Sequence, residues 1–257
     1  TNIGVARYDL SSNTWLPLWD EDNLLNSNEI TSIEKDTNPN NLWIGGGDGL
    51  QLINTTTESE ILHWPEGSSQ YPGGRNPYQV TIIDDILYYR YQWQYGGSNW
   101  GEDQIRRIDL TSSSTLSNLD VGQRLGVDGW TWGMGQSGDY LNIGVSEYGG
   151  GNQGGGNAPD GGIAQWDTSS NSWAPNIELT PSINDVESIK TSQGEYWVAW
   201  GEEKVVRYDN SGVIITEFPS NIMALPVRGI VEWDNQVLFA TEEGVERWDM
   251  STDSWDS

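Results

Sequence analysis

The sequence predicts an all-β repeat fold, and three observations carry this prediction. A hexapeptide with alternating apolar and polar positions recurs six times within the 257 residues. A segment rich in Trp or aliphatic residues precedes most copies, and stretches of Asn, Asp, Ser and Gly separate the segments as tight turns require. Four short strands in each repeat are typical of the blades of a β-propeller. We therefore expect an all-β propeller of four-stranded blades.

The recurring hexapeptide has the period of a strand with one buried face. Its copies read GVARYD, GLQLIN, QIRRID, GIAQWD, KVVRYD and GVERWD, and they end at Asp9, Asn54, Asp109, Asp167, Asp209 and Asp249. Successive copies lie 45, 55, 58, 42 and 40 residues apart. We interpret the hexapeptide as the third strand of a blade, after which the Asp side chain caps a turn.

The other strands of each blade are predicted from the segments around the hexapeptide. First strands are expected at 30–36, 78–84, 185–191 and 227–234. Second strands, which end in small residues, are expected at 41–46, 140–145, 196–201 and 236–241. Outer strands follow the turn in NTWLPLW, SEILHWP, NSWAPNI and VIITEFP.

Six hexapeptides are preceded by only five pairs of inner strands. We therefore predict five complete blades and one N-terminal half-blade within a single domain, 1–257. The half-blade covers 3–19, and the blades cover 30–65, 78–120, 129–177, 185–219 and 227–257. The half-blade lacks its inner strands, so either upstream sequence supplies them or the half-blade closes the ring in an unusual way. Because the chain starts at Thr1, we expect it to be part of a longer chain.

Blade 1 carries a resemblance to a known family. Its segment ITSIEKDTNPNNLWIGGGDGLQLIN, 30–54, resembles the repeat of the two-component regulator propellers, in which a strand ending in Asp precedes Leu-Trp-Ile-Gly, Gly-Leu and aromatic-Asp. The resemblance implies an extracytoplasmic sensor or interaction module and supplies no catalytic residues. Kelch repeats are the second candidate, because three segments keep the kelch spacing of an aromatic residue, six others and a Trp. These segments are 8–15, 166–173 and 248–255, but the last two blades lack the kelch Gly-Gly doublet.

The composition restricts the partners of the protein. With 38 acidic and 12 basic side chains the net charge is −26, which repels nucleic acid and anionic lipid. The chain has no Cys, which excludes disulfides and thiolate chemistry. No apolar run approaches the roughly 20 residues of a membrane span. We expect an extracellular, cell-surface or periplasmic protein with a protein, peptide or glycan partner and no insertion into a membrane.

Three sequence features are candidates for catalysis or ligand binding. His63, the single histidine, falls in a predicted outer strand and is expected to be a surface side chain. The segment GGGNQG, 149–154, matches G-x-G-x-x-G but no helix pattern follows, so we interpret it as a loop. Asp20 and Asp22 in DEDN offer oxygen ligands for Ca²⁺ without the fixed spacing of a calcium loop. They are the metal candidates, and no other cofactor is expected.

The acidic residues leave an enzymatic alternative open. Paired carboxylates hydrolyse glycosides, so a carbohydrate-active hydrolase or lyase is the alternative to a noncatalytic binding module. No two carboxylates stand out as a pair, because many of the acids occupy turn positions. We therefore predict no catalytic residues.

Two insertions depart from the repeat and predict the binding site. Blade 2 carries RYQWQYGGSNWGED at 90–103, and blade 3 carries VDGWTWGMG at 127–135 together with the Gly-rich loop. Loops that interrupt a repeat usually lie on a binding face. Aromatic rings flanked by Gln and Asn suit sugars or an extended peptide. The predicted ligand-binding residues are Trp93, Tyr95, Trp100, Trp130 and Trp132, with packing between blades as the alternative role.

Overall fold

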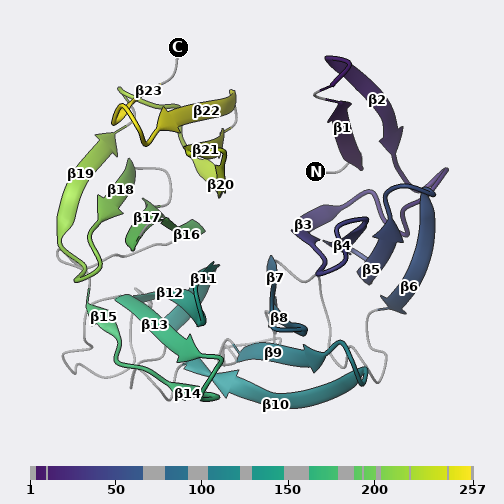
Figure 1. Ribbon diagram of the computed structural model, residues 1–257, viewed down its shortest axis with the longest axis horizontal. Helices are drawn as coiled ribbons and strands as arrows, with labels where there is room; N and C mark the ends of the chain where they lie inside the picture. The colour runs from purple at the N-terminus through teal and green to yellow at the C-terminus, as the bar shows by residue number, and fades with distance from the viewer. Residues whose placement is uncertain are drawn as a thin grey trace, which may run out of the picture. The chain divides into compact units, whose positions relative to one another are not determined.

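The computed structural model confirms the all-β prediction (Figure 1). It describes residues 4–9, 11–65, 79–91, 104–121, 129–147, 162–178, 188–192, 194–200, 204–219, 221–241 and 243–255. Within these ranges the chain forms 23 β-strands, which pair into antiparallel sheets. No helix in the described ranges is long and apolar enough to span a membrane. The chain divides into two compact units, Thr1–Asp120 and Val121–Ser257.

The first unit holds the half-blade and two four-stranded blades. The half-blade pairs β1 (Val5–Asp9) with β2 (Thr14–Trp19). Blade 1 has the order β3 (Ile30–Lys35), β4 (Asn41–Gly46), β5 (Gly49–Asn54) and β6 (Ser59–Pro65). Blade 2 has the order β7 (Gln79–Ile83), β8 (Ile86–Tyr91), β9 (Gln104–Asp109) and β10 (Ser114–Asp120).

The second unit holds three blades. Blade 3 consists of β11 (Gly129–Ser137), β12 (Tyr140–Glu147), β13 (Gly162–Asp167), β14 (Ser172–Trp173) and β15 (Ile177–Glu178). Blade 4 consists of β16 (Ser188–Ser192), β17 (Glu195–Trp200), β18 (Lys204–Tyr208) and β19 (Ile214–Pro219). Blade 5 consists of β20 (Val227–Trp233), β21 (Gln236–Thr241), β22 (Gly244–Asp249) and β23 (Ser254–Trp255). Together the sheets form the predicted five blades and half-blade of a β-propeller, whereas the single domain stays a prediction.

The outer strand of blade 3 differs from the prediction. The segment NSWAPNI forms two short strands, β14 and β15, which both pair with β13. Between them Pro175 offers no backbone N–H, while the N–H of Ala174 still reaches the backbone oxygen of Gln165 at 3.0 Å. The proline interrupts the ladder, and pairing resumes two residues later.

Successive blades in each unit pack through apolar faces. The first strands lie side by side, β3 with β7 in the first unit, and β11 with β16 and β16 with β20 in the second. Trp43 and Leu50 of blade 1 are buried together with Val80 and Leu87 of blade 2. Trp197 and Phe218 of blade 4 are buried together with Phe239 and Trp248 of blade 5, and the rings of Phe218 and Trp248 are 4.9 Å apart. Burial of such large side chains is the main stabilisation of the fold.

The hairpins between third and fourth strands share one turn, as the repeated Asp predicts. In five of the six described hairpins, Oδ1 of the Asp or Asn accepts hydrogen bonds of 2.7–3.4 Å from the backbone N–H groups two and three residues later. The fifth turn residue then takes a left-handed conformation with φ between 49° and 55°. These fifth residues are Asn13, Glu58, Ser113, Asn171 and Asp253. Blade 4 has a shorter turn, in which Gly212 takes the positive φ.

The aromatic spacing that resembles kelch repeats reflects cross-strand pairing. Trp166 lies opposite Trp173, and Trp248 lies opposite Trp255. In both pairs the rings meet edge to face, at 5.2 Å and 5.3 Å. The spacing is therefore explained by the length of the shared turn and by the preference of aromatic pairs for T-shaped contact.

Candidate functional site

The predicted aromatic site lies mostly outside the described residues. Trp93, Tyr95 and Trp100 fall in 92–103, which the structure does not describe. Trp130 and Trp132 belong to β11, where the backbone of Trp130 pairs with that of Ser146. The ligand-binding role of these five residues therefore remains a prediction.

Two boundaries of the predicted insertions need correction. The segment 127–135 is not an insertion from Gly129 onward, because its residues form the first strand of blade 3 and pair with β12. Likewise Arg90 and Tyr91 are the last residues of β8, where they pair with β9. The alternation of large and small residues in Gly-Trp-Thr-Trp-Gly was the signal of a strand.

The remaining insertions occupy one position in the blade. Residues 92–103 connect the second and third strands of blade 2, and 148–161 connect the second and third strands of blade 3. In blade 1 the same connection is a tight turn between Gly46 and Gly49. Inserted loops at one connection lie at the same end of their blades. This end of the blade is therefore the candidate site.

In blade 1 that end holds a recess lined by polar side chains. The recess has a volume of about 210 Å³ including open solvent, and it is lined by Asn26, Ser27, Ile30, Ile44, Gly46, Asp48, Gly49, Gln51 and His63. The His63 Nε2 atom lies 3.1 Å from the backbone oxygen of Asp48 and 3.4 Å from its Oδ2 atom. The structure thus places His63 in the outer strand, as predicted, and adds its contact with the β4–β5 turn.

A buried amide forms one wall of the recess. Gln51 Nε2 donates to the backbone oxygen of Leu24 and to Oε2 of Glu60, both at 2.9 Å. Asn26 Nδ2 donates to the same Glu60 oxygen at 2.6 Å, and the Asn26 backbone N–H donates to Gln51 Oε1 at 3.3 Å. These bonds hold the β2–β3 connection against blade 1 and satisfy the buried amide.

Glycine allows the close approach at the turn. A Cβ atom on Gly46 would lie 2.5 Å from the backbone oxygen of Glu29, and that oxygen accepts a 3.0 Å hydrogen bond from the N–H of Gly47. A side chain at position 46 would therefore displace the connection that lines the recess.

Sequence reasoning missed the contact between His63 and Asp48. The antiparallel register supplies the missing signal, because β5 and β6 pair Gln51 with His63 and Gly49 with Pro65. A turn residue immediately before β5 then lies beside the end of the outer strand.

Hydrogen bonds in the shared turn stabilise the ionised form of the Asp carboxylates and so lower their pKa values. Hydrogen bonds from the hydroxyls of Ser12 and Ser11 lower the pKa of Asp9 to about 2. The pKa values of Asp109, Asp167 and Asp249 are also lowered, chiefly by hydrogen bonds from Ser112, Ser169 and Ser251. A general acid in glycoside hydrolysis requires the opposite shift. These four carboxylates stabilise turns.

Asp20 likewise accepts hydrogen bonds from the residues that follow it in a turn. Its Oδ1 atom accepts hydrogen bonds from the N–H of Asp22 at 3.0 Å and from Asn23 Nδ2 at 2.7 Å. Its backbone oxygen accepts from the N–H groups of Leu24 and Leu25. Within the described part of the chain, no group of three or more His, Asp or Glu side chains is arranged to hold a metal ion. Calcium binding at Asp20 and Asp22 stays a prediction.

Comparison with known proteins supports the fold. No protein-family model matches the sequence, and no curated protein matches it. Among 1044 similar solved chains is the computationally designed Ika8 protein, with 14% identity, a TM-score of 0.53, and coverage of 89% of this chain and 60% of that one. BamB from Moraxella catarrhalis is similar with 16% identity, a TM-score of 0.50, and coverage of 84% and 59%. The chain spans about three fifths of the length of both, and the likeness shows the fold alone.

Proposed function

We propose that this protein is a noncatalytic β-propeller module that binds a segment of a partner protein outside the cytoplasm. The observation that carries the proposal is the shared position of the insertions in blades 2 and 3. Both 92–103 and 148–161 connect the second and third strands of a blade. In blade 1 the same connection borders the recess beside Asp48 and His63.

The residues of the insertions fit an extended peptide. Trp93, Tyr95 and Trp100 are interleaved with Gln and Asn, so that flat rings can pack on the ligand while amides bond its backbone. Trp130 and Trp132 in β11 are proposed as ligand-binding residues of blade 3. The net charge of −26 favours a basic segment, because charge complementarity speeds encounter and excludes acidic partners.

Two further features support the noncatalytic and extracytoplasmic parts of the proposal. The lowered pKa values of Asp9, Asp109, Asp167 and Asp249 assign these carboxylates to turns. The resemblance of 30–54 to the two-component regulator propellers favours a location outside the cytoplasm. The finer assignment to that family, with kelch repeats as the second choice, remains part of the proposal.

The test is a binding screen followed by substitution. An array of extended peptides rich in Lys and Arg is the first probe, and a glycan array is the second. Trp93→Ala and Trp100→Ala should each weaken peptide binding and leave the melting temperature nearly unchanged. Trp43→Ala is the matched control, because its buried ring should instead matter for stability.

Other results would replace the proposal. Binding to glycans without binding to peptides would change the ligand class. Turnover of a polysaccharide, abolished by one Asp or Glu substitution, would establish a hydrolase or lyase. A large drop in melting temperature for Trp93→Ala and Trp100→Ala would assign these rings to packing.

A further inference from the structure

The recess in blade 1 presents hydrogen-bond acceptors to a ligand. Both hydrogens of the Gln51 amide nitrogen are used, by the backbone oxygen of Leu24 and by Oε2 of Glu60, each at 2.9 Å. The amide oxygen of Gln51 accepts one long bond of 3.3 Å, from the N–H of Asn26. The side chain of Asp48 is 54% exposed. Because an amide oxygen accepts two hydrogen bonds and a carboxylate accepts several, the recess favours a ligand that donates.

The charge of the recess favours a cation. Within the described part of the chain, the residues that line the recess include one carboxylate, that of Asp48, and no Lys or Arg. A second carboxylate, that of Glu60, is bonded to the amides of Gln51 and Asn26, which both belong to the lining. The other titratable side chain of the lining is His63, whose Nε2 atom lies 3.4 Å from Asp48 Oδ2. A donor with a positive charge makes the strongest hydrogen bond to such a carboxylate.

The apolar part of the lining suits the stem of a lysine. Ile30 and Ile44 line the recess, and Ile44 is 3% exposed. The methylenes of a lysine pack on apolar side chains while its ammonium stays among polar atoms. An ammonium is a compact charge with three donors, whereas a guanidinium is planar and donates as a fixed fork. A recess of about 210 Å³, part of which is open solvent, with one carboxylate in its lining fits the compact head.

The turn that carries Asp48 is fixed by its glycines. A Cβ atom on Gly47 would lie 2.9 Å from Oγ of Ser27 and 3.2 Å from Oε2 of Glu29. The N–H of Gly47 donates to the backbone oxygen of Glu29 at 3.0 Å, and Gly49 has φ 109°. The turn therefore packs closely on the β2–β3 connection and holds Asp48 in place before a ligand arrives. Such preorganisation lowers the entropy that binding costs.

We propose that this recess binds the ammonium group of a lysine side chain in the partner segment. The Asp48 carboxylate and the Gln51 amide oxygen accept hydrogen bonds from the ammonium, and the methylenes of the lysine lie along Ile30 and Ile44. The inference rests on the proposed function and adds to it the residue that the partner supplies to blade 1.

The experiment titrates the whole chain with capped lysine, N-acetyl-lysine N-methylamide, and follows the ring signals of His63 by NMR at constant pH. His63 is the only histidine of the chain and lines the recess, so its signals are assigned at once. Capped lysine should shift these signals with a dissociation constant of about 1–10 mM. Capped norleucine has the same stem without the ammonium and should leave them unchanged. Equal shifts with the two probes would overturn the proposal.

Two further titrations test the charge and the shape of the ligand. Raising NaCl from about 20 mM to about 500 mM should weaken the binding of capped lysine, because salt screens its attraction to Asp48. Capped arginine should bind more weakly than capped lysine. Arginine binding as tight as lysine binding would overturn the assignment of lysine, and binding that ignores salt would contradict the role of the carboxylate.

A substitution then locates the site. Asp48→Ser removes the carboxylate and should raise the dissociation constant of capped lysine at least about tenfold, as expected for a hydrogen bond to a charged group. Asp85→Asn is the matched control, since it removes the same charge from an exposed position in the turn between β7 and β8. It should leave binding nearly unchanged. Circular dichroism and melting curves confirm that each variant folds. A folded Asp48→Ser chain that binds capped lysine like the unmodified chain would disprove the proposal.

The capped probes separate this inference from the proposed function. If capped lysine binds at Asp48 but no peptide of the array does, the recess stands and the proposed function fails. If peptides bind, but neither Asp48→Ser nor replacement of their lysines by norleucine weakens them, the proposed function stands and the recess plays no part.

Discussion

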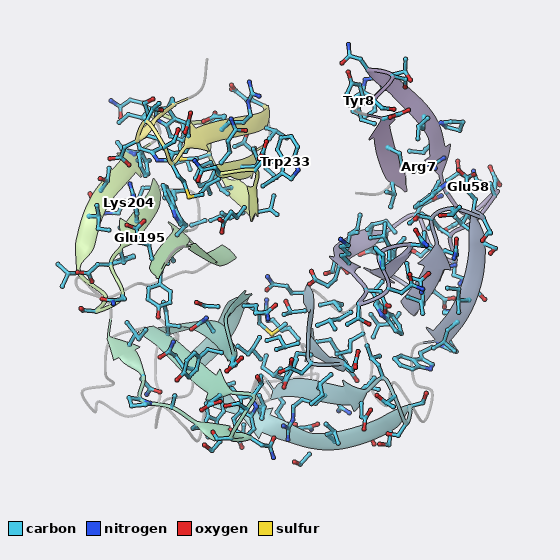
Figure 2. The ribbon with its side chains drawn as sticks, in the orientation of Figure 1. Arg7, Tyr8, Glu58, Glu195, Lys204 and Trp233 are labelled. Carbon is cyan, nitrogen blue, oxygen red and sulfur yellow. The ribbon has the colours of Figure 1, made fainter. Side chains whose placement is uncertain are left out.

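The Nη1 atom of Arg7 lies 2.7 Å from Oε1 of Glu58, which joins the half-blade to the left-handed turn residue of blade 1 (Figure 2). The second unit repeats this relationship, because Arg207 of blade 4 forms an ion pair with Asp253, the left-handed turn residue of blade 5. Each guanidinium also lies over a Trp ring, Arg7 over Trp19 at 4.0 Å and Arg207 over Trp197 at 5.1 Å. The half-blade and blade 4 therefore use the same hexapeptide position for an arginine that links each of them to the next blade.

Loss of Arg207 should destabilise the protein. Arg207 donates to Glu195 at 2.6 Å and 3.1 Å as well as to Asp253, and its side chain is largely buried. We expect Arg207→Ala to lower the free energy of unfolding by about 1–3 kcal/mol, as measured by urea denaturation. Lys204→Ala removes the more exposed pair with Glu217 and should cost less than about 1 kcal/mol. Equal effects would contradict a special role for Arg207.

The buried ring of Trp197 should contribute more than any link between charges. Trp197 is fully buried and stacks on Phe218 with ring centroids 5.7 Å apart. Trp197→Ala removes that contact and leaves a cavity, so the free energy of unfolding should fall by about 3–5 kcal/mol. Trp197→Phe should cost less, because it keeps an aromatic ring in the same place. A loss below about 1 kcal/mol for Trp197→Ala in chemical denaturation would show that the stability of blades 4 and 5 does not depend on the packing of this ring.

A glycine at the left-handed turn position of blade 2 should increase the stability of the protein. Ser113 has φ 55°, a conformation that costs an L-residue about 1 kcal/mol relative to glycine. Ser113→Gly should therefore raise the free energy of unfolding by up to about 1 kcal/mol in urea denaturation. Ser113→Val should lower it, because a β-branched side chain is still less compatible with this φ. The opposite order would mean that the turn changes conformation.

Stability should fall in acid through the capping carboxylates. The folded pKa of Asp9 is about 2, below its ordinary value of 3.8, so its contribution is fully present above about pH 4. That contribution is lost as the pH falls through the folded pKa. The lowered pKa values of Asp109, Asp167 and Asp249 add to the same decline.

An NMR titration tests whether the serine hydroxyl is the cause of the lowered pKa of Asp9. Ser12→Ala removes the largest cause of the shift and should bring the pKa of Asp9 back toward 3.8. Asn substitution of Asp9 should flatten the loss of stability between about pH 4 and pH 2. An unchanged pKa in Ser12→Ala would rule out the hydroxyl as the cause.

The strands and turns were predictable because their causes are local. The alternation in GVERWD marks one buried face, and Asp249 with Ser251 marks the turn that the structure shows. Register could not be deduced in the same way. It depends on where the strands pair, and it decides that His63 meets Asp48 across 15 positions of the chain. Interblade links such as Arg207 to Asp253 depend on packing that no local pattern encodes.

The insertions show that composition alone does not distinguish a binding loop from a strand. In GWTWG the composition of a binding loop and the alternation of a strand coincide, and pairing with β12 decided for the strand. The aromatic site at Trp93, Tyr95 and Trp100 rests on composition, and its ligand requires measurement. The spacing predicts that Trp15 lies in an outer strand, and the structure adds that it lies opposite Tyr8 in the β1–β2 hairpin.

The shared turn has a consequence for how the chain acquires its fold. Its hydrogen bonds connect residues only two or three positions apart, from Asp9 to Ser11 or from Asp249 to Thr252. Closing such a short loop costs little entropy, so each outer hairpin needs no distant partner to form. We expect the hairpins to become protected first in pulsed hydrogen exchange during refolding, with the inner strands following. In a chain emerging from the ribosome the inner strands of each blade leave first, so each blade would be completed when its outer hairpin forms.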